Sequence, residues 1–134
     1  MKETPEQRSR IMRAVKATDT APEMTVRRLT HRMGYRFRLH RNDLPGKPDL
    51  VFPRLHKVVF VHGCFWHGHA CARGARVPKG NRAYWLKKVD SNRVRDQRNL
   101  ERLALDGWRA LVIWECSTRD ERHLRELVRI FLTE

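Results

Sequence analysis

The stretch Val58-Val-Phe-Val-His-Gly-Cys-Phe-Trp-His-Gly-His-Ala-Cys71 decides the fold and concentrates the chemistry of this chain. Its first four residues are an unbroken β-branched and aromatic run, which is typical of a strand buried on both faces. The eight residues after Gly63 include two cysteines, two histidines and two large aromatic residues. Such a cluster can hold a metal ion, exchange protons or insert into nucleic acid, and we expect different residues to take each role.

The size and charge of the chain limit its class. A length of 134 residues fits one domain with a single core. The formal net charge of +14 favours a polyanionic partner, most often nucleic acid. No apolar stretch approaches the roughly 20 residues that a membrane span needs, and the N-terminus has no signal-peptide core. We therefore expect a cytoplasmic protein that does not bind membranes.

Hydrophobic periodicity and cap signals predict the order α-β-β-β-α-β-α, a mixed central sheet flanked by helices. Thr20-Ala-Pro-Glu23 has the pattern of a capping box that opens the first helix. Trp108 and Trp114 are expected in the core, because they lie in a predicted strand. The predicted strands are residues 35–39, 49–52, 58–62 and 108–114, the long helix is residues 83–106, and the last helix starts near Ser117 or Thr118.

Two basic segments are candidates for DNA contacts. Residues 1–20 are either a solvated arm or an arm that gains order by clasping DNA, and residues 21–134 are expected to form one domain. The basic loop 73–82 is expected to be mobile until DNA binds.

The three cysteines point to a structural metal site. Cys64, His69 and Cys71 lie close together in sequence, and Cys116 follows the last predicted strand. Two kinds of ligand in a set of four, thiolate and imidazole, suit tetrahedral zinc. The alternatives are that the cysteines are small buried hydrophobic residues, or that His67 is the fourth ligand.

Asp49 and His62 occupy the positions of a nuclease site. In nucleases of the restriction-endonuclease fold, an Asp and a backbone carbonyl on adjacent strands bind Mg²⁺, and an acid and a lysine follow on the second strand. Here Phe60 stands where the acid would be and His62 where the lysine would be. This departure argues against an ordinary restriction enzyme.

A family resemblance becomes specific at this point. The chain resembles the very short patch repair (Vsr) endonucleases over nearly its whole length, in residues Asp49, His62–Cys71, Trp85, Asn92, Asp96 and Trp114–Cys116. The resemblance implies a restriction-endonuclease-like α/β fold. It also implies a bacterial, nucleoid-associated enzyme that uses Mg²⁺ to nick one DNA strand 5′ to the T of a T:G mismatch.

The resemblance also implies roles for single residues. Asp49 and the carbonyl of Val61 would bind Mg²⁺, and His62 and His67 would flank the scissile phosphate. One histidine would act as the general base and the other would assist the phosphate or the leaving oxygen. Glu23 would lie near the active site, unless the capping box is its whole function.

Aromatic side chains are candidates for reading the mismatch. A mismatched step is the cheapest to unstack, so Phe65, Trp66 and Trp85 are expected to wedge between bases, with Met12 entering from the opposite groove. For Phe65 and Trp66 the alternative is ordinary core packing. Asn92 and Asp96 share one helix face and would contact DNA, support the active site, or simply be solvated.

The expected partner is double-stranded DNA with a T:G mismatch, bound by a monomer, and a mismatch-repair protein is a possible second partner. Two other functions fit parts of the sequence. One is a zinc-stapled DNA-binding module without catalysis, which leaves Asp49, His62 and His67 without a role. The other is a nuclease of the same fold that is not directed to mismatches.

Overall fold

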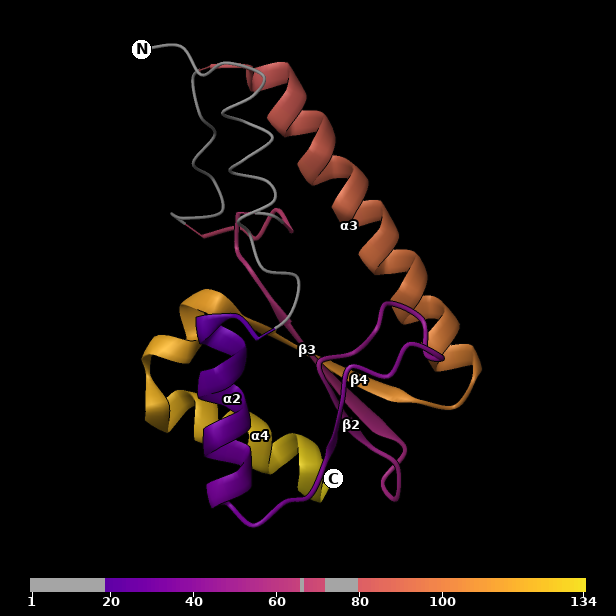
Figure 1. The fold of residues 1–134 in the computed structure, drawn as a ribbon, viewed down its shortest axis with the longest axis vertical. Helices are drawn as coiled ribbons and strands as arrows, with labels where there is room; N and C mark the ends of the chain where they lie inside the picture. The colour runs from indigo at the N-terminus through magenta and orange to yellow at the C-terminus, as the bar shows by residue number, and fades with distance from the viewer. Residues whose placement is uncertain (1–18, 66, 72–79) are drawn as a thin grey trace.

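The computed structural model describes residues 19–65, 67–71 and 80–134. A four-stranded sheet lies between two helices on one face and one long helix on the other (Figure 1). The elements are α2 (Ala21–Arg32), β1 (Arg38–Leu39), β2 (Leu50–Phe52), β3 (Lys57–His62), α3 (Arg82–Leu105), β4 (Arg109–Trp114), the 3₁₀-helix η1 (Glu115–Arg119) and α4 (Glu121–Thr133). The order of helices and strands predicted from the sequence is confirmed.

The sheet is mixed, in the order β1-β2-β3-β4. β1 and β3 both run antiparallel to β2, and β3 runs parallel to β4. The parallel pair aligns His62 at the end of β3 with Trp114 at the end of β4. The two segments that carry cysteines, which follow His62 and Trp114, therefore leave the sheet at the same edge.

Side chains that alternate between the two faces of the strands divide the core into two layers. Leu50, Phe52 and Val59 pack with α2 and α4 on one face. Val51, Val58 and Phe60 pack with the end of α3 on the other. Successive residues of a strand point to opposite faces, so an unbroken apolar run fills both layers. The buried run at the start of the opening stretch thus forms the central strand, as predicted.

Two boundaries differ from the prediction. The strand predicted for residues 35–39 is reduced to Arg38–Leu39, because the Tyr35 N–H still bonds to the Thr30 carbonyl of α2 at 3.3 Å. The last helix begins at Glu121, after η1. Asp120 is its N-cap and accepts from the His123 N–H at 3.2 Å, whereas the Thr118 hydroxyl donates to the Glu115 carbonyl at 2.7 Å.

The capping box at the start of α2 is only half formed. The Thr20 hydroxyl accepts a hydrogen bond from the Glu23 N–H at 3.3 Å, as the pattern predicts. The Glu23 carboxylate does not complete the box and instead contacts Arg27 and His40. Capping is therefore not the whole function of Glu23.

Candidate active site and metal centre

Asp49 lies where β2 begins, beside the end of β3. Its Oδ2 atom accepts a hydrogen bond from the Val61 N–H at 2.6 Å. Burial, and to a smaller extent the nearby Glu23 carboxyl, raise the pKa of Asp49 to about 7. The Val61 N–H and Arg27 oppose this shift. A carboxyl with this pKa holds a proton near neutral pH unless another positive charge replaces it.

Glu23 lies in α2 on the same side of the site, with only 1% of its surface exposed. Its Oε2 atom lies 2.5 Å from the Arg27 guanidinium and 2.8 Å from Nε2 of His40. A buried carboxylate needs such charged and hydrogen-bonded partners to stay ionised.

Two histidines form the other side of the site. His62 is the last residue of β3 and is buried, and His67 lies in the loop that follows. Their rings stack at a centroid distance of 3.9 Å and an angle of 5°. His67 Nδ1 lies 2.5 Å from the Asp96 carboxylate of α3, and His62 Nδ1 lies 3.9 Å from the same oxygen.

The two histidines have different environments. Burial, and to a smaller extent the nearby His67, lower the pKa of His62 to about 4, although Asp96 opposes the shift. His62 Nδ1 is buried and has no hydrogen-bond partner among the described residues. His62 is therefore neutral across the physiological pH range, and its Nδ1 atom lies out of contact with solvent, near Asp96.

One cavity of about 1010 Å³ is lined by His40, Asp49, His62, His67 and Asp96, whereas Glu23 and Arg27 lie outside its lining. Asp49 and His40 line it from the sheet, and Asn92 and Asp96 from α3. Among the residues that the structure describes, Lys47 and Arg95 are the lysine and arginine side chains that line it. The cavity is large enough for a backbone phosphate and its neighbouring sugars, and cations at its border suit that anion.

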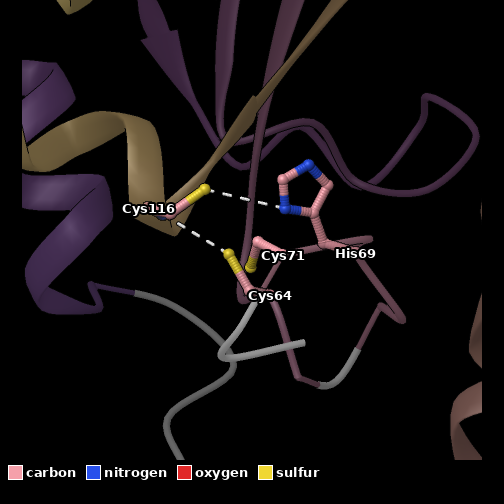
Figure 2. Close-up of side chains that lie close together, drawn as sticks. All are labelled: Cys64, His69, Cys71 and Cys116. Carbon is pink, nitrogen blue, oxygen red and sulfur yellow. Dashed lines mark hydrogen bonds between the residues drawn. The ribbon is translucent and has the colours of Figure 1, made fainter. Parts of the chain in front are cut away.

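The four predicted zinc ligands converge in space. One ligand atom from each of Cys64, His69, Cys71 and Cys116 lies within 4.8 Å of the others (Figure 2). Cys116 Sγ lies 3.6 Å from Nδ1 of His69, and the Cys116 N–H donates to Cys64 Sγ at 3.4 Å. None of the three cysteines forms a disulfide. His67 groups instead with His62 and Asp96, so the geometry does not favour it as the fourth ligand.

The sulfur atoms of this cluster are closely spaced and partly withdrawn from solvent. Burial is the main cause that raises the pKa of the Cys64 thiol to about 12, and the nearby Cys116 and Cys71 also raise it. Deprotonating such a thiol requires a compensating positive charge, which a bound cation supplies.

Only some of the residues predicted to wedge between bases lie in the part of the chain that the structure describes. Phe65 is half-buried and packs edge to face with Trp85 at a centroid distance of 5.9 Å. Trp85 is 4% exposed, so it would have to move to reach a base. Trp66, Met12, the arm through residue 18 and loop residues 72–79 lie outside the described residues.

Two contributions were not foreseen from the sequence, and one open alternative is narrowed. His40 contacts Glu23 and lines the cavity. Asp96, expected to contact DNA, to support the active site or to be solvated, binds His67 directly, which favours the supporting role. Trp114, expected in the core, is half-buried and stacks on the His69 ring at 4.2 Å. Spacing along α3 places Asp96 on one face with Asn92 but does not reveal its contact with the loop, and no local signal marks His40.

In the part of the chain that the structure describes, no helix is long and apolar enough to cross a membrane.

Comparison with known proteins identifies the family. The family model described as DNA mismatch endonuclease Vsr matches residues 2–73. The chain is 50% identical to a type II nicking enzyme, V.XorIIP, of Xanthomonas oryzae pv. oryzae, over 96% of this chain and 94% of the relative. It is 37% identical to the type II nicking enzyme V.NmeAIP of Neisseria meningitidis, over 98% and 93%. It is 41% identical to the DNA mismatch endonuclease Vsr of Escherichia coli, over 89% and 76%. The chain therefore belongs to the Vsr family of DNA mismatch endonucleases and is a DNA endonuclease.

Proposed function

We propose that this endonuclease nicks one strand of double-stranded DNA on the 5′ side of the T in a T:G mismatch, in a Mg²⁺-dependent reaction. The observation that supports the proposal most is the cavity in which Asp49 faces a stacked pair, His62 and His67. Phosphodiester hydrolysis needs charge neutralisation on the phosphate, activation of water and help for the leaving oxygen. The word mismatch in the name of the Escherichia coli relative supports the choice of substrate.

The donors around Asp49 suit Mg²⁺. The N–H and C=O groups of one strand residue point to the same edge, so the Val61 carbonyl faces Asp49 as its N–H does. Carboxylate and carbonyl oxygens are the ligands that a hard cation prefers. Burial and the nearby Glu23 carboxyl raise the pKa of Asp49, and a bound cation would favour the ionised carboxylate. When bound, Mg²⁺ would neutralise charge on the scissile phosphate.

The two histidines can divide the movement of protons. His62 is neutral, and a neutral imidazole can accept a proton, which suits it to activate the attacking water. Asp96 accepts from Nδ1 of His67 and so fixes the orientation of that ring. We assign the general base to His62 and the stabilisation of the phosphate or leaving oxygen to His67.

We assign zinc to the second cluster. Cys64, His69, Cys71 and Cys116 offer sulfur and nitrogen donors only, and four such donors in a closed set suit a structural zinc ion. Thiolate ligands select softer metals than the oxygen ligands at Asp49 do. This difference would keep the two metals apart, although Cys64 follows His62 by only two residues.

DNA recognition is assigned to the residues near the cavity and to the arm. Phe65 and Trp66, with Trp85 after a rearrangement, would wedge between bases beside the mismatch. Met12 and the arm of residues 1–20 would approach from the other groove, and Asn92 would contact the DNA from the wall of the cavity. The net charge of +14 opposes self-association, which supports a monomer on DNA. A cytoplasmic, nucleoid-associated location and recruitment by a mismatch-repair protein complete the proposal.

A nicking assay on Asp49→Ala tests the function. Duplexes containing T:G or T:A, labelled on either strand, are incubated with and without Mg²⁺. We expect wild type to nick only the T-containing strand of the T:G duplex, and only with Mg²⁺. Asp49→Ala should lose at least about 10³-fold in rate because the site loses its central carboxylate, while DNA binding measured by anisotropy persists.

Asp43→Ala is the matched control, because Asp43 is exposed and pairs with Arg41 outside the cavity. Its rate should equal that of wild type. Full activity of Asp49→Ala would refute the site. Equal nicking of T:A and T:G would favour a nuclease of the same fold that is not directed to mismatches.

A further inference from the structure

His40 is a side chain of the cavity to which no role has yet been given. It directly follows β1, and its backbone has a left-handed conformation with φ of +46°. A non-glycine residue in this conformation costs free energy, and such residues gather at functional sites. The His40 N–H also bonds to the Asp49 carbonyl at 3.5 Å, which ties this bend to the start of β2.

The bend directs the imidazole to a buried carboxylate. His40 Nε2 lies 2.8 Å from Oε2 of Glu23, which is 1% exposed. An ionised carboxylate only accepts hydrogen bonds, so Nε2 of His40 is the donor. Arg27 reaches the same oxygen from α2 at 2.5 Å. Glu23 is thus held from two directions, by its own helix and by the residue after β1.

The position of Glu23 matters because its carboxyl lies beside that of Asp49. Two carboxyl groups held together next to the Val61 backbone form an oxygen-rich site for a divalent cation or its water ligands. A long side chain such as Glu23 keeps one orientation only if its partners restrict it. Besides Asp49, His40 is a partner of Glu23 that comes from outside its helix.

We propose that His40 is a positioning residue, whose Nε2–H donates to Glu23 and fixes that carboxylate beside Asp49 for divalent-cation binding. The inference rests on the proposed Mg²⁺ site. Asp19, Glu23 and His40 also lie close enough to be cation ligands themselves. Arg27 contacts both Asp19 and Glu23, however, and already places a positive charge there.

Two substitutions distinguish the hydrogen bond to Glu23 from the effect of the left-handed backbone at residue 40. In His40→Gln the amide nitrogen is as many bonds from Cβ as Nε2 is, so it can still donate to Glu23. In His40→Asn the amide is too short to reach Glu23, but asparagine tolerates the left-handed conformation better than histidine does. A merely structural role would therefore make His40→Asn the milder change, whereas the positioning role makes it the more severe one.

The test measures Mn²⁺ binding to the zinc-loaded protein by calorimetry, together with single-turnover nicking of T:G DNA across Mg²⁺ concentrations. Outer-shell partners of metal ligands typically contribute 10–100-fold, so we expect His40→Asn to weaken Mn²⁺ binding and to lower the rate at limiting Mg²⁺ by at least about tenfold. His40→Gln should stay within about threefold of wild type. The thermal midpoint of His40→Asn and its affinity for DNA should not fall.

Three outcomes would overturn the proposal. Wild-type behaviour of His40→Asn would show that Glu23 needs no outside partner. Equal impairment of both variants with a lowered thermal midpoint would show a structural role. Loss of one whole Mn²⁺ per chain in both variants would make His40 a ligand. If wild type itself fails to nick T:G DNA, the proposed function fails, while Mn²⁺ binding still reports on His40.

Discussion

The ionised Asp49 carboxylate destabilises the folded, metal-free protein, and a bound Mg²⁺ ion would remove this cost. Its pKa rises from an ordinary value of 3.8 to about 7 in the folded, metal-free protein. Between these two values the folded state holds a proton that the unfolded state has released, so stability is lost as the pH rises toward 7. The cost is complete above pH 7, where the carboxylate is ionised without a cation.

Asp49→Asn should therefore stabilise the metal-free protein in a pH-dependent way. The gain in the free energy of unfolding should be small at pH 4.5 and on the order of 2 kcal/mol at pH 8, a value reduced for the partial exposure of the group. Urea unfolding at both pH values measures it. Mg²⁺ should raise the thermal midpoint of wild type but not of Asp49→Asn.

Asp43→Asn is a control with the opposite sign. Arg41 lowers the pKa of Asp43, so that ion pair favours folding at neutral pH and its removal should give no gain. A gain for Asp49→Asn that is the same at pH 4.5 and pH 8 would contradict the assignment of the cost to ionisation.

Single residues were predictable where the residue type has a narrow range of chemical roles. The structure brings Asp49 and His62 into one cavity, as expected from the sequence. It also brings together the four residues of the Cys/His cluster, Cys64, His69, Cys71 and Cys116. His40 was missed because its role arises from contacts with α2 and β2, which lie 17 and 9 residues away. Periodicity describes only neighbours along one element, so it cannot reveal such a contact.

At the scale of elements, the Cys/His cluster joins the loop after β3 to the end of β4. Cys64 and His69 belong to the loop, and Cys116 lies in η1. The register of β3 and β4 could not be read from the sequence, yet it places these segments at one edge of the sheet. The start of α4 was misplaced because Thr118 and Asp120 are both plausible caps, and only the tertiary structure selects Asp120.

Cys116→Ser should release zinc and destabilise the fold. Structural zinc contributes on the order of 10 kcal/mol in zinc-finger peptides, so the loss of one thiolate should lower the free energy of unfolding by at least about 3 kcal/mol. Zinc content by mass spectrometry should fall from one ion per chain to well below one, and thermal unfolding should occur earlier.

Ser117→Ala changes the next residue of η1 without removing a donor from the cluster and should retain one zinc ion. His67 should also lose its orientation when the loop is released, so nicking should fall in Cys116→Ser. An unchanged zinc content in this variant would refute the four-ligand site.

At the scale of the whole molecule, the excess of positive charge sets the affinity for DNA. The chain has 29 lysine and arginine residues against 15 acidic residues, and Lys47 and Arg95 lie at the cavity itself. Composition alone predicted a polyanionic partner. Composition could not show which lysine and arginine side chains face the DNA, because α3 and α4 lie on opposite faces of the sheet (Figure 1).

Arg95→Gln and Arg125→Gln should distinguish local contacts from net charge. Each removes one positive charge from an exposed helical position, but only Arg95, in α3, lines the cavity. If Arg95 contacts a phosphate, the slope of log K against log salt should fall by about 1 in Arg95→Gln and not in Arg125→Gln. Phosphate contacts carry no sequence information, so T:G and T:A duplexes should lose affinity equally in anisotropy titrations. An equal change of slope in both variants would instead assign binding to the overall charge, and a loss confined to T:G DNA would make Arg95 part of mismatch recognition.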